Sequence, residues 1–147
     1  MGVLENGPGA VVLLRAEMDA LPIEEKTGLP YASRRKVRTP NGVTVGVSHA
    51  CGHDLHMAVL LGAGGALARF RSAWSGTLLC VGQPSEEATS GARAMIQEGL
   101  YERFPRPHYA FALHAGPGIP LGSVGYQEKL VSAGSRSLDL VIRGLGG

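Results

Sequence analysis

Residues 10–16 read AVVLLRA, an apolar run that follows a Pro-Gly turn and indicates the first strand of the fold. The run is rich in β-branched residues and does not alternate polar with apolar positions, which is typical of a strand buried on both faces of a sheet. Residues 77–81, TLLCV, repeat this pattern, and residues 109–114, YAFALH, are a third predicted strand. We therefore expect these three strands to build a sheet.

Helical periodicity appears between the predicted strands. Apolar residues recur at helical spacing over residues 54–70, and Asp54 is suitably placed as the N-cap of this helix. A second helix is expected over residues 91–103, where apolar residues again share one face. Because strands and helices alternate along the chain, we expect an α/β fold with a parallel-rich sheet and right-handed crossover helices.

The remaining segments are less regular. Residues 21–48 contain turn signals and charges without sustained periodicity, so this stretch is expected to be a long functional loop. After a Gly/Pro-rich segment, residues 123–127 and 138–143 are two further β-like stretches.

The composition fits one globular domain or part of one. With 147 residues, 44% hydrophobic and 18% charged, the chain is long enough for one core and is not typical of a disordered or fibrous protein. The net charge is +2, and the basic run at residues 34–38 has no RNA-binding or helix-turn-helix motif beside it, so no nucleic-acid partner is expected. No signal peptide and no apolar run of about 18 residues is visible, which predicts a cytoplasmic protein without a membrane anchor.

Possible metal ligands are concentrated in residues 49–56, HACGHDLH, which contain three of the five histidines. The Cys51 thiolate and the His53 imidazole are separated by one glycine and can converge on one ion from a loop. Helix capping with surface histidines is the simpler alternative, but cysteine and histidine together at this spacing favour a metal site. Cys80 lies in an apolar run, so a core thiol is favoured over a disulfide with Cys51.

Two adjacent carboxylates, Glu86 and Glu87, follow the predicted strand at residues 77–81. They repel each other, yet the pair becomes favourable beside a divalent cation. One glutamate can then bind metal while the other takes a proton from water. Without other evidence, such a pair is more often only a polar loop.

Two more polar residues follow strands. His114 ends the third predicted strand, and Asp19 lies just beyond the first, where an acid could orient a ligand or bridge ions. Either residue alone would be read as structural. Ligands of open α/β sheets bind outside the carboxyl ends of the strands, and Cys51 and His53 precede a crossover helix. The sequence therefore predicts one site at this edge, which also includes the paired glutamates.

With these residues, the chain resembles the M20 metallopeptidase family, and within it the amidohydrolase branch that includes hippurate hydrolases, N-acyl amino acid amidohydrolases and auxin-conjugate hydrolases. The resemblance spans nearly the whole chain, and the stretches that carry it are residues 15–22, 49–56, 83–87, 91–96, 113–114 and 143–147. It implies a zinc-peptidase-like catalytic domain, truncated, over residues 1–130. Residues 131–147 would be the truncated start of a lid or dimerisation domain with its first strand, in a family that is usually homodimeric.

The resemblance also implies roles for the candidate residues. A divalent metal centre, with two ions, would be held by Cys51, His53, Glu87 and His114, with Cys51 bridging; Glu86 would be the general base and Asp19 the acid that orients the site. Zinc or manganese is expected, and cobalt or nickel also suits these ligands. An ion-activated water would give its proton to the base and attack the amide carbonyl of an N-acyl amino acid or small peptide.

The chain departs from the family pattern in several places. Glu17 stands where Asp is expected, and Arg136 stands where many members have Asp. Family members are more than twice as long, begin with a helical segment and supply another metal-binding histidine near the C-terminus. The isolated chain is therefore expected to have an incomplete site and weak activity.

Two other functions have less support from the sequence. A non-catalytic metal-binding or partner-binding remnant would need ligands but no base, so the presence of Glu86 speaks against it. A nucleotide-binding α/β domain has little support, because no phosphate-cradling Gly-rich motif follows a strand.

Overall fold

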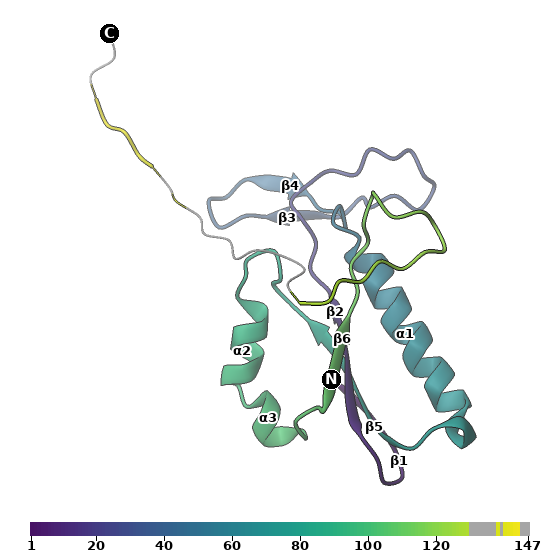
Figure 1. Ribbon diagram of the computed structural model, residues 1–147. Coiled ribbons are helices and arrows are strands. Elements are labelled where there is room, and N and C mark those ends of the chain that lie inside the picture. Colours follow the sequence, from purple (N-terminus) through teal and green to yellow (C-terminus); the bar gives the residue numbers. More distant parts are fainter. Residues whose placement is uncertain (130–137, 139, 145–147) are drawn as a thin grey trace. The chain divides into compact units, whose positions relative to one another are not determined.

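The computed structural model describes residues 1–129, 138 and 140–144 (Figure 1). The chain divides into two units, residues 1–115 and residues 116–147. The expected lid segment at residues 131–147, with Arg136 and the terminal glycines, lies largely outside the described residues, and the boundary at residue 130 stays a prediction.

The first unit is built on a four-stranded sheet with the order β1-β5-β2-β6. β2 (Val11–Glu17) pairs in parallel with β5 (Gly76–Gln83) on one side and with β6 (Tyr109–Ala112) on the other. The expected parallel-rich α/β fold is therefore confirmed. β1 (Gly2–Asn6) was not expected, and it pairs antiparallel with β5 at the edge of the sheet.

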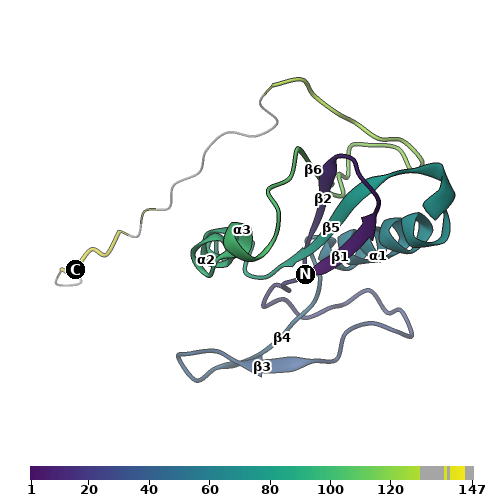
Figure 2. The ribbon, with the colours of Figure 1, turned by 90° about the horizontal axis from the view of Figure 1, so that it is seen from below.

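Helices cover both faces of this sheet. α1 (His53–Arg69) lies on one face, while α2 (Gly91–Gln97) and α3 (Leu100–Arg103) lie on the other (Figures 1 and 2). The core side chains alternate along the strands accordingly. Leu13, Leu79 and Val81 form the buried cluster, and Met95 of α2 packs against it.

The start of α1 differs from the expectation. Asp54 is not the N-cap: the cap is Gly52, whose φ of 78° turns the chain into the helix, so that His53 is the first helical residue. A residue with a Cβ rarely adopts this φ, which explains the glycine. Asp54 instead lies in the first turn, where its charge interacts favourably with the positive end of the helix dipole.

The predicted helix at residues 91–103 is in fact two helices, because Gly99 between α2 and α3 has a φ of 87°. The predicted loop at residues 21–48 contains an antiparallel hairpin of β3 (Lys36–Arg38) and β4 (Thr44–Gly46). A short 3-10 helix, η1 (Arg71–Ala73), precedes β5. Among the described residues, no helix is long and apolar enough to cross a membrane.

The loop after β5 is held tightly against the start of α2. The backbone N–H groups of Ser90 and Gly91 donate to the carbonyl oxygen of Ser85 at 3.2 and 3.1 Å. A Cβ at position 91 would collide with the carbonyl oxygen of Pro84, so only glycine fits this approach. Ser85 has a φ of 50°, a conformation that non-glycine residues seldom adopt and that is often found at functional sites.

The second unit has turns but no helix or strand among its described residues. The N–H of Ile119 donates to the carbonyl of Gly116 at 3.1 Å, and the N–H of Ser123 donates to that of Pro120 at 3.0 Å. The predicted strand at residues 123–127 is therefore wrong, and the described positions within residues 138–143 are also outside any strand. A β-like pattern needs a partner strand, and no ladder is formed by these described residues.

Candidate metal centre

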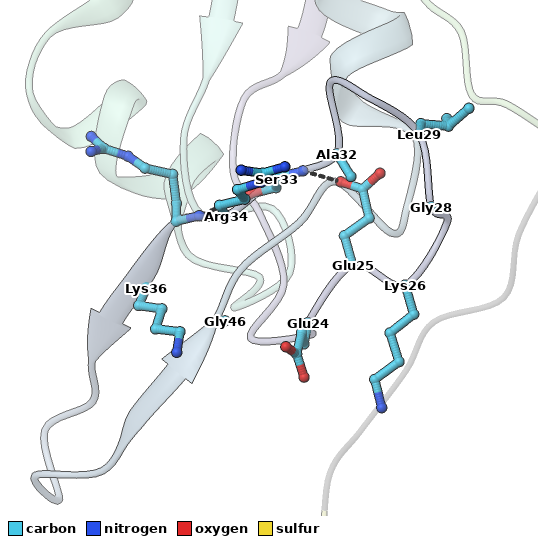
Figure 3. A pocket seen from close by; sticks show the side chains of 11 residues that line it. Glu24, Glu25, Lys26, Gly28, Leu29, Ala32, Ser33, Arg34, Lys36 and Gly46 are labelled. Carbon is cyan, nitrogen blue, oxygen red and sulfur yellow. Dashed lines mark hydrogen bonds between the residues drawn. The ribbon is translucent and has the colours of Figure 1, made fainter.

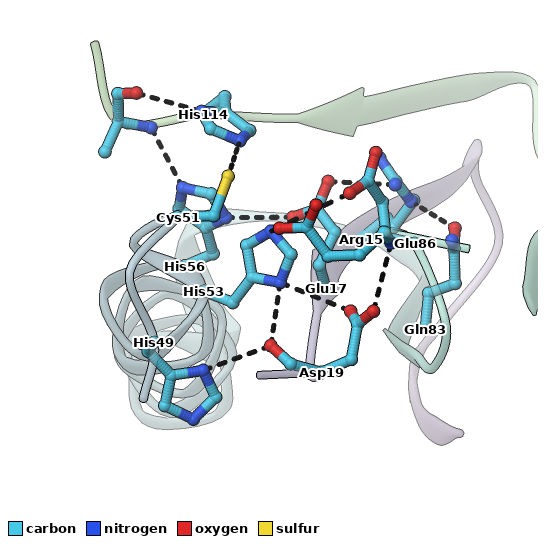
Figure 4. A network of polar contacts seen from close by, with 12 residues as sticks. Arg15, Glu17, Asp19, His49, Cys51, His53, His56, Gln83, Glu86 and His114 are labelled. Carbon is cyan, nitrogen blue, oxygen red and sulfur yellow. Dashed lines mark hydrogen bonds and ion pairs between the residues drawn. The ribbon is translucent and has the colours of Figure 1, made fainter. Parts of the chain in front are cut away.

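Asp19 connects three parts of the site (Figure 4). It lies two residues after the end of β2, and its backbone carbonyl oxygen accepts hydrogen bonds from Nδ1 of His49 at 3.1 Å and Nδ1 of His53 at 3.0 Å. Its Oδ2 atom accepts the backbone N–H of Glu87 at 3.0 Å. Burial raises the pKa of Asp19, but hydrogen bonds from backbone N–H groups and the nearby His53 outweigh this, so that its pKa is lowered. Asp19 is thus a carboxylate at neutral pH.

The unpaired nitrogen of His53 points at the two glutamates. Because a carbonyl oxygen only accepts hydrogen bonds, the bond to Asp19 requires a proton on Nδ1, and in the neutral imidazole Nε2 then has a lone pair. Nε2 lies 3.9 Å from Oε2 of Glu86 and 3.8 Å from Oε1 of Glu87. His53 is fully buried, and within the described chain its Nε2 has no hydrogen-bond partner.

A lone pair that faces two carboxylates is unfavourable in the protein alone, since all three groups are electron-rich. A divalent cation removes the conflict, because imidazole nitrogen and carboxylate oxygen are both common metal ligands. Oδ1 of Asp19 is likewise buried without a hydrogen bond, although it lies 3.2 Å from Nδ1 of His53. The side chains therefore fit a metal centre.

A second part of the site joins Cys51 to His114. The Sγ atom of Cys51 lies 3.4 Å from Nε2 of His114. His114 donates from Nδ1 to the carbonyl of Ala115 at 2.9 Å, so in the neutral ring its Nε2 has a lone pair that faces the sulfur. Burial raises the pKa of the Cys51 thiol, and the hydrogen bond and negative charge of Glu87 raise it further. A bound cation would reverse this effect, because metal-bound cysteine is a thiolate.

Among the described residues, the possible ligand atoms form three groups, each with all its atoms within 4.8 Å of one another: Cys51, His53 and His114; His53, Glu86 and Glu87; Glu17, His53 and His56. His53 belongs to all three. The six residues predicted from the sequence thus lie together beyond the carboxyl ends of β2, β5 and β6. Their roles as ligands, base and orienting acid stay predictions.

Sequence reasoning missed a buried pair behind these residues. Nδ1 of His56 donates to Oε2 of Glu17 at 2.9 Å, and both side chains are buried. Arg15 contacts the other oxygen of Glu17 at 2.8 Å and donates from Nε to Gln83 at 2.6 Å. The available signal was spacing, because positions three apart on a helix share a face, and His56 is three residues after His53.

Glu17 makes folding depend on pH in one direction. Burial raises its pKa, but hydrogen bonding to its own backbone N–H, the positive charge of Arg15 and the hydrogen bond from His56 together lower the pKa below its ordinary value. A lowered pKa means that the carboxylate stabilises the folded state above the ordinary pKa of about 4.3. This contribution is lost as the pH falls through the lowered pKa of the folded protein.

We therefore expect Glu17→Gln to lower the free energy of unfolding by about 1–3 kcal/mol at pH 7, since a hydrogen bond to a charged group is lost. The difference from wild type should shrink as the pH falls through the lowered pKa of Glu17, where the wild-type carboxylate also becomes protonated. Urea unfolding at several pH values measures this difference. The exposed Glu98→Gln is the control, and a Glu17→Gln difference that is constant with pH would contradict the assignment.

Two hollows lie in the first unit. The larger, about 540 Å³, is lined by charged and small residues of the segment 24–36 together with Gly46 (Figure 3). It contains none of the candidate ligands. The smaller, about 240 Å³, lies between α1, β2 and β6, is lined mainly by apolar side chains and includes His56. The candidate metal centre is therefore next to the smaller hollow, which it meets at His56.

Comparison with known proteins gives a consistent result. N-acetylcysteine deacetylase from Bacillus subtilis (strain 168) is 36% identical over 143 residues, which are 97% of this chain and 34% of that protein. N-acetyldiaminopimelate deacetylase from Lactobacillus helveticus (strain DPC 4571) is also 36% identical over 143 residues, again with 97% and 34% covered. The chain thus spans about a third of the length of these relatives.

A solved structure shows the same fold. A Bacillus subtilis protein described as a dinuclear metal binding peptidase from the M20 family superposes with a TM-score of 0.73 at 35% identity, covering 86% of this chain and 32% of that one. The family model described as peptidase family M20/M25/M40 matches residues 13–137, most of the chain. The resemblance inferred from the sequence is confirmed: the chain belongs to peptidase family M20/M25/M40.

Proposed function

We propose that this chain is the metal-binding part of a metal-dependent amidohydrolase, which cleaves the amide bond of N-acyl amino acids or small peptides. The observation that carries the proposal is the buried Nε2 atom of His53, which has no hydrogen-bond partner among the described residues and faces the carboxylates of Glu86 and Glu87 at 3.9 and 3.8 Å. The deacetylase names of its relatives and the dinuclear metal site of the related structure support it.

The proposed ligands of a divalent centre with two ions are Cys51, His53, Glu87 and His114. When bound, such ions lower the pKa of water and polarise a substrate carbonyl. The mixture of thiolate, imidazole and carboxylate suits zinc or manganese, and cobalt or nickel would also bind such ligands.

The two glutamates have different proposed tasks. The side chain of Glu86 is 37% exposed, against 29% for that of Glu87, so it is better placed to meet solvent and substrate. Glu86 would take a proton from the water molecule while that water attacks the amide carbonyl. Glu86 would then pass the proton to the leaving amine. Asp19 would orient the ligands, because it accepts hydrogen bonds from the ring of His53 and from the backbone N–H of Glu87.

Metal analysis by mass spectrometry tests the proposal, with hydrolysis of a panel of N-acyl amino acids assayed on the same samples. We expect divalent metal in the wild-type chain and in Cys80→Ala, whose thiol lies in β5 and in none of the ligand groups. Cys51→Ser should lose metal, because a serine hydroxyl is a poor replacement for a thiolate.

Metal loss in Cys51→Ser together with slow hydrolysis by wild type would support the amidohydrolase. Metal without any hydrolysis would mean a truncated site, which an amidohydrolase fragment and a metal-binding remnant would share. Wild-type protein that takes up no divalent metal would contradict both.

A further inference from the structure

His56 is buried at the centre of the site, yet neither of its ring nitrogens is free. The side chain is 1% exposed, and the atoms of Glu17, His53 and His56 are close enough to form a ligand group. However, Nε2 of His56 accepts the backbone N–H of Ala115 at 2.9 Å, and Nδ1 donates to Glu17 at 2.9 Å. A metal at either nitrogen would have to break one of these buried hydrogen bonds.

The two hydrogen bonds also fix the tautomer of His56. A backbone N–H can only donate and a carboxylate can only accept, so Nδ1 has the proton and Nε2 the lone pair. Glu17 is itself held by Arg15 at 2.8 Å, and Arg15 is bonded to Gln83. A continuous chain of hydrogen bonds therefore runs from the end of β5 through β2 and α1 to Ala115.

Ala115 in turn determines how His114 lies. The carbonyl of Ala115 accepts Nδ1 of His114 at 2.9 Å, while its N–H is held by His56. The pairing of β6 with β2 ends at Ala112, so His114 lies beyond the ladder. The His56 and His114 rings are in edge contact, with centroids 4.5 Å apart.

We propose that His56 is a positioning residue, which holds the Ala115 peptide and through it directs Nε2 of His114 toward Cys51. Glu17 keeps His56 in the tautomer that can accept from Ala115. The expected effect of His56 on metal affinity rests on the proposed function. Its expected effect on the orientation and tautomer of the His114 ring does not.

Two amide substitutions separate this role from a general structural one. In Gln, the side-chain amide reaches about as far as Nε2 of histidine, so His56→Gln can still accept the Ala115 N–H. In Asn, the amide reaches only about as far as Nδ1, so His56→Asn can keep Glu17 but loses Ala115. Both variants bury one polar amide at the same position. They differ in how far that amide extends from the backbone.

The experiment uses the full chain labelled with ¹⁵N. In the metal-free protein we expect His56→Asn to speed hydrogen exchange of the Ala115 amide at least ~10-fold, since its acceptor is gone. The preference of His114 for a proton on Nδ1 should also be lost, whereas His56→Gln should stay close to wild type. Titration with cobalt(II), followed by thiolate-to-cobalt absorbance, should show ~10- to 100-fold weaker binding for His56→Asn only.

Equal behaviour of the two variants, in Ala115 exchange and in the His114 tautomer, would overturn the proposal. A measurement on wild type covers the case in which a variant fails to fold: a proton on Nε2 of His56 in the metal-free chain would also overturn it. If wild type binds no cobalt(II), the proposed function fails, while the exchange and tautomer measurements still test the positioning role.

Discussion

His53→Ala should weaken divalent metal binding by ~100-fold or more, the largest loss expected of any single substitution in this chain. His53 is the residue shared by all three groups of possible ligands, and its Nε2 is buried opposite both glutamates. Removing the imidazole would leave those carboxylates without the nitrogen that is proposed to bind the ion beside them. Competition with a chromophoric chelator measures the change in affinity.

His49→Ala is the matched control. His49 donates to the same carbonyl oxygen of Asp19, at 3.1 Å against 3.0 Å for His53, but it belongs to none of the ligand groups. We expect its metal affinity to stay within about threefold of wild type. If the two alanine variants bound metal equally well, His53 would be no more than a buried structural histidine.

Glu86→Gln should have the second largest effect, and on rate rather than on binding. Gln cannot take a proton from water, so hydrolysis should fall by roughly 10²- to 10⁴-fold, the usual contribution of a general base. Metal content should be unchanged, because Glu86 is not among the proposed ligands. Hydrolysis of an N-acyl amino acid at high protein concentration, with metal analysis of the same sample, measures both quantities.

The neighbouring Glu87→Gln supplies the comparison. Because Glu87 is a proposed ligand, Glu87→Gln should lose metal and activity together, whereas Glu86→Gln should lose activity alone. A Glu86→Gln chain that hydrolyses substrate as fast as wild type would rule out Glu86 as the base. If neither substitution changed anything but wild type still bound metal, the non-catalytic remnant would be the better description.

The central sheet could be predicted because its strands are short apolar runs, and segments with the apolar spacing of helices separate them along the chain. β2 and β5 were found in this way to within two residues at either end. β1 was not, because its residues are mostly exposed and it is held only along one side by β5. α1 was also found to within one residue at either end. The second predicted helix was wrong in its length, because Gly99 begins α3 in a left-handed backbone conformation that apolar periodicity does not reveal.

The location of the site could also be predicted, since parallel strands bring their carboxyl ends to one edge. What could not be predicted is which nitrogen of each histidine faces the centre. For His53 and His56 that choice is made by main-chain groups of Asp19 and Ala115, which lie near these two rings only in the folded chain. The Glu17–His56 pair was missed for the same reason, because its residues are 39 positions apart.

The hydrogen bonds that Asp19 accepts from His49 and His53 end on its backbone oxygen, not on its side chain. Every amino acid has that oxygen, so replacing residue 19 does not remove the group that aligns the two imidazoles. Replacement removes only the carboxylate, which receives the N–H of Glu87 and lies 3.2 Å from Nδ1 of His53. A mutational scan of position 19 would therefore report the contacts of its carboxylate and would not detect the alignment of the imidazoles by its backbone oxygen.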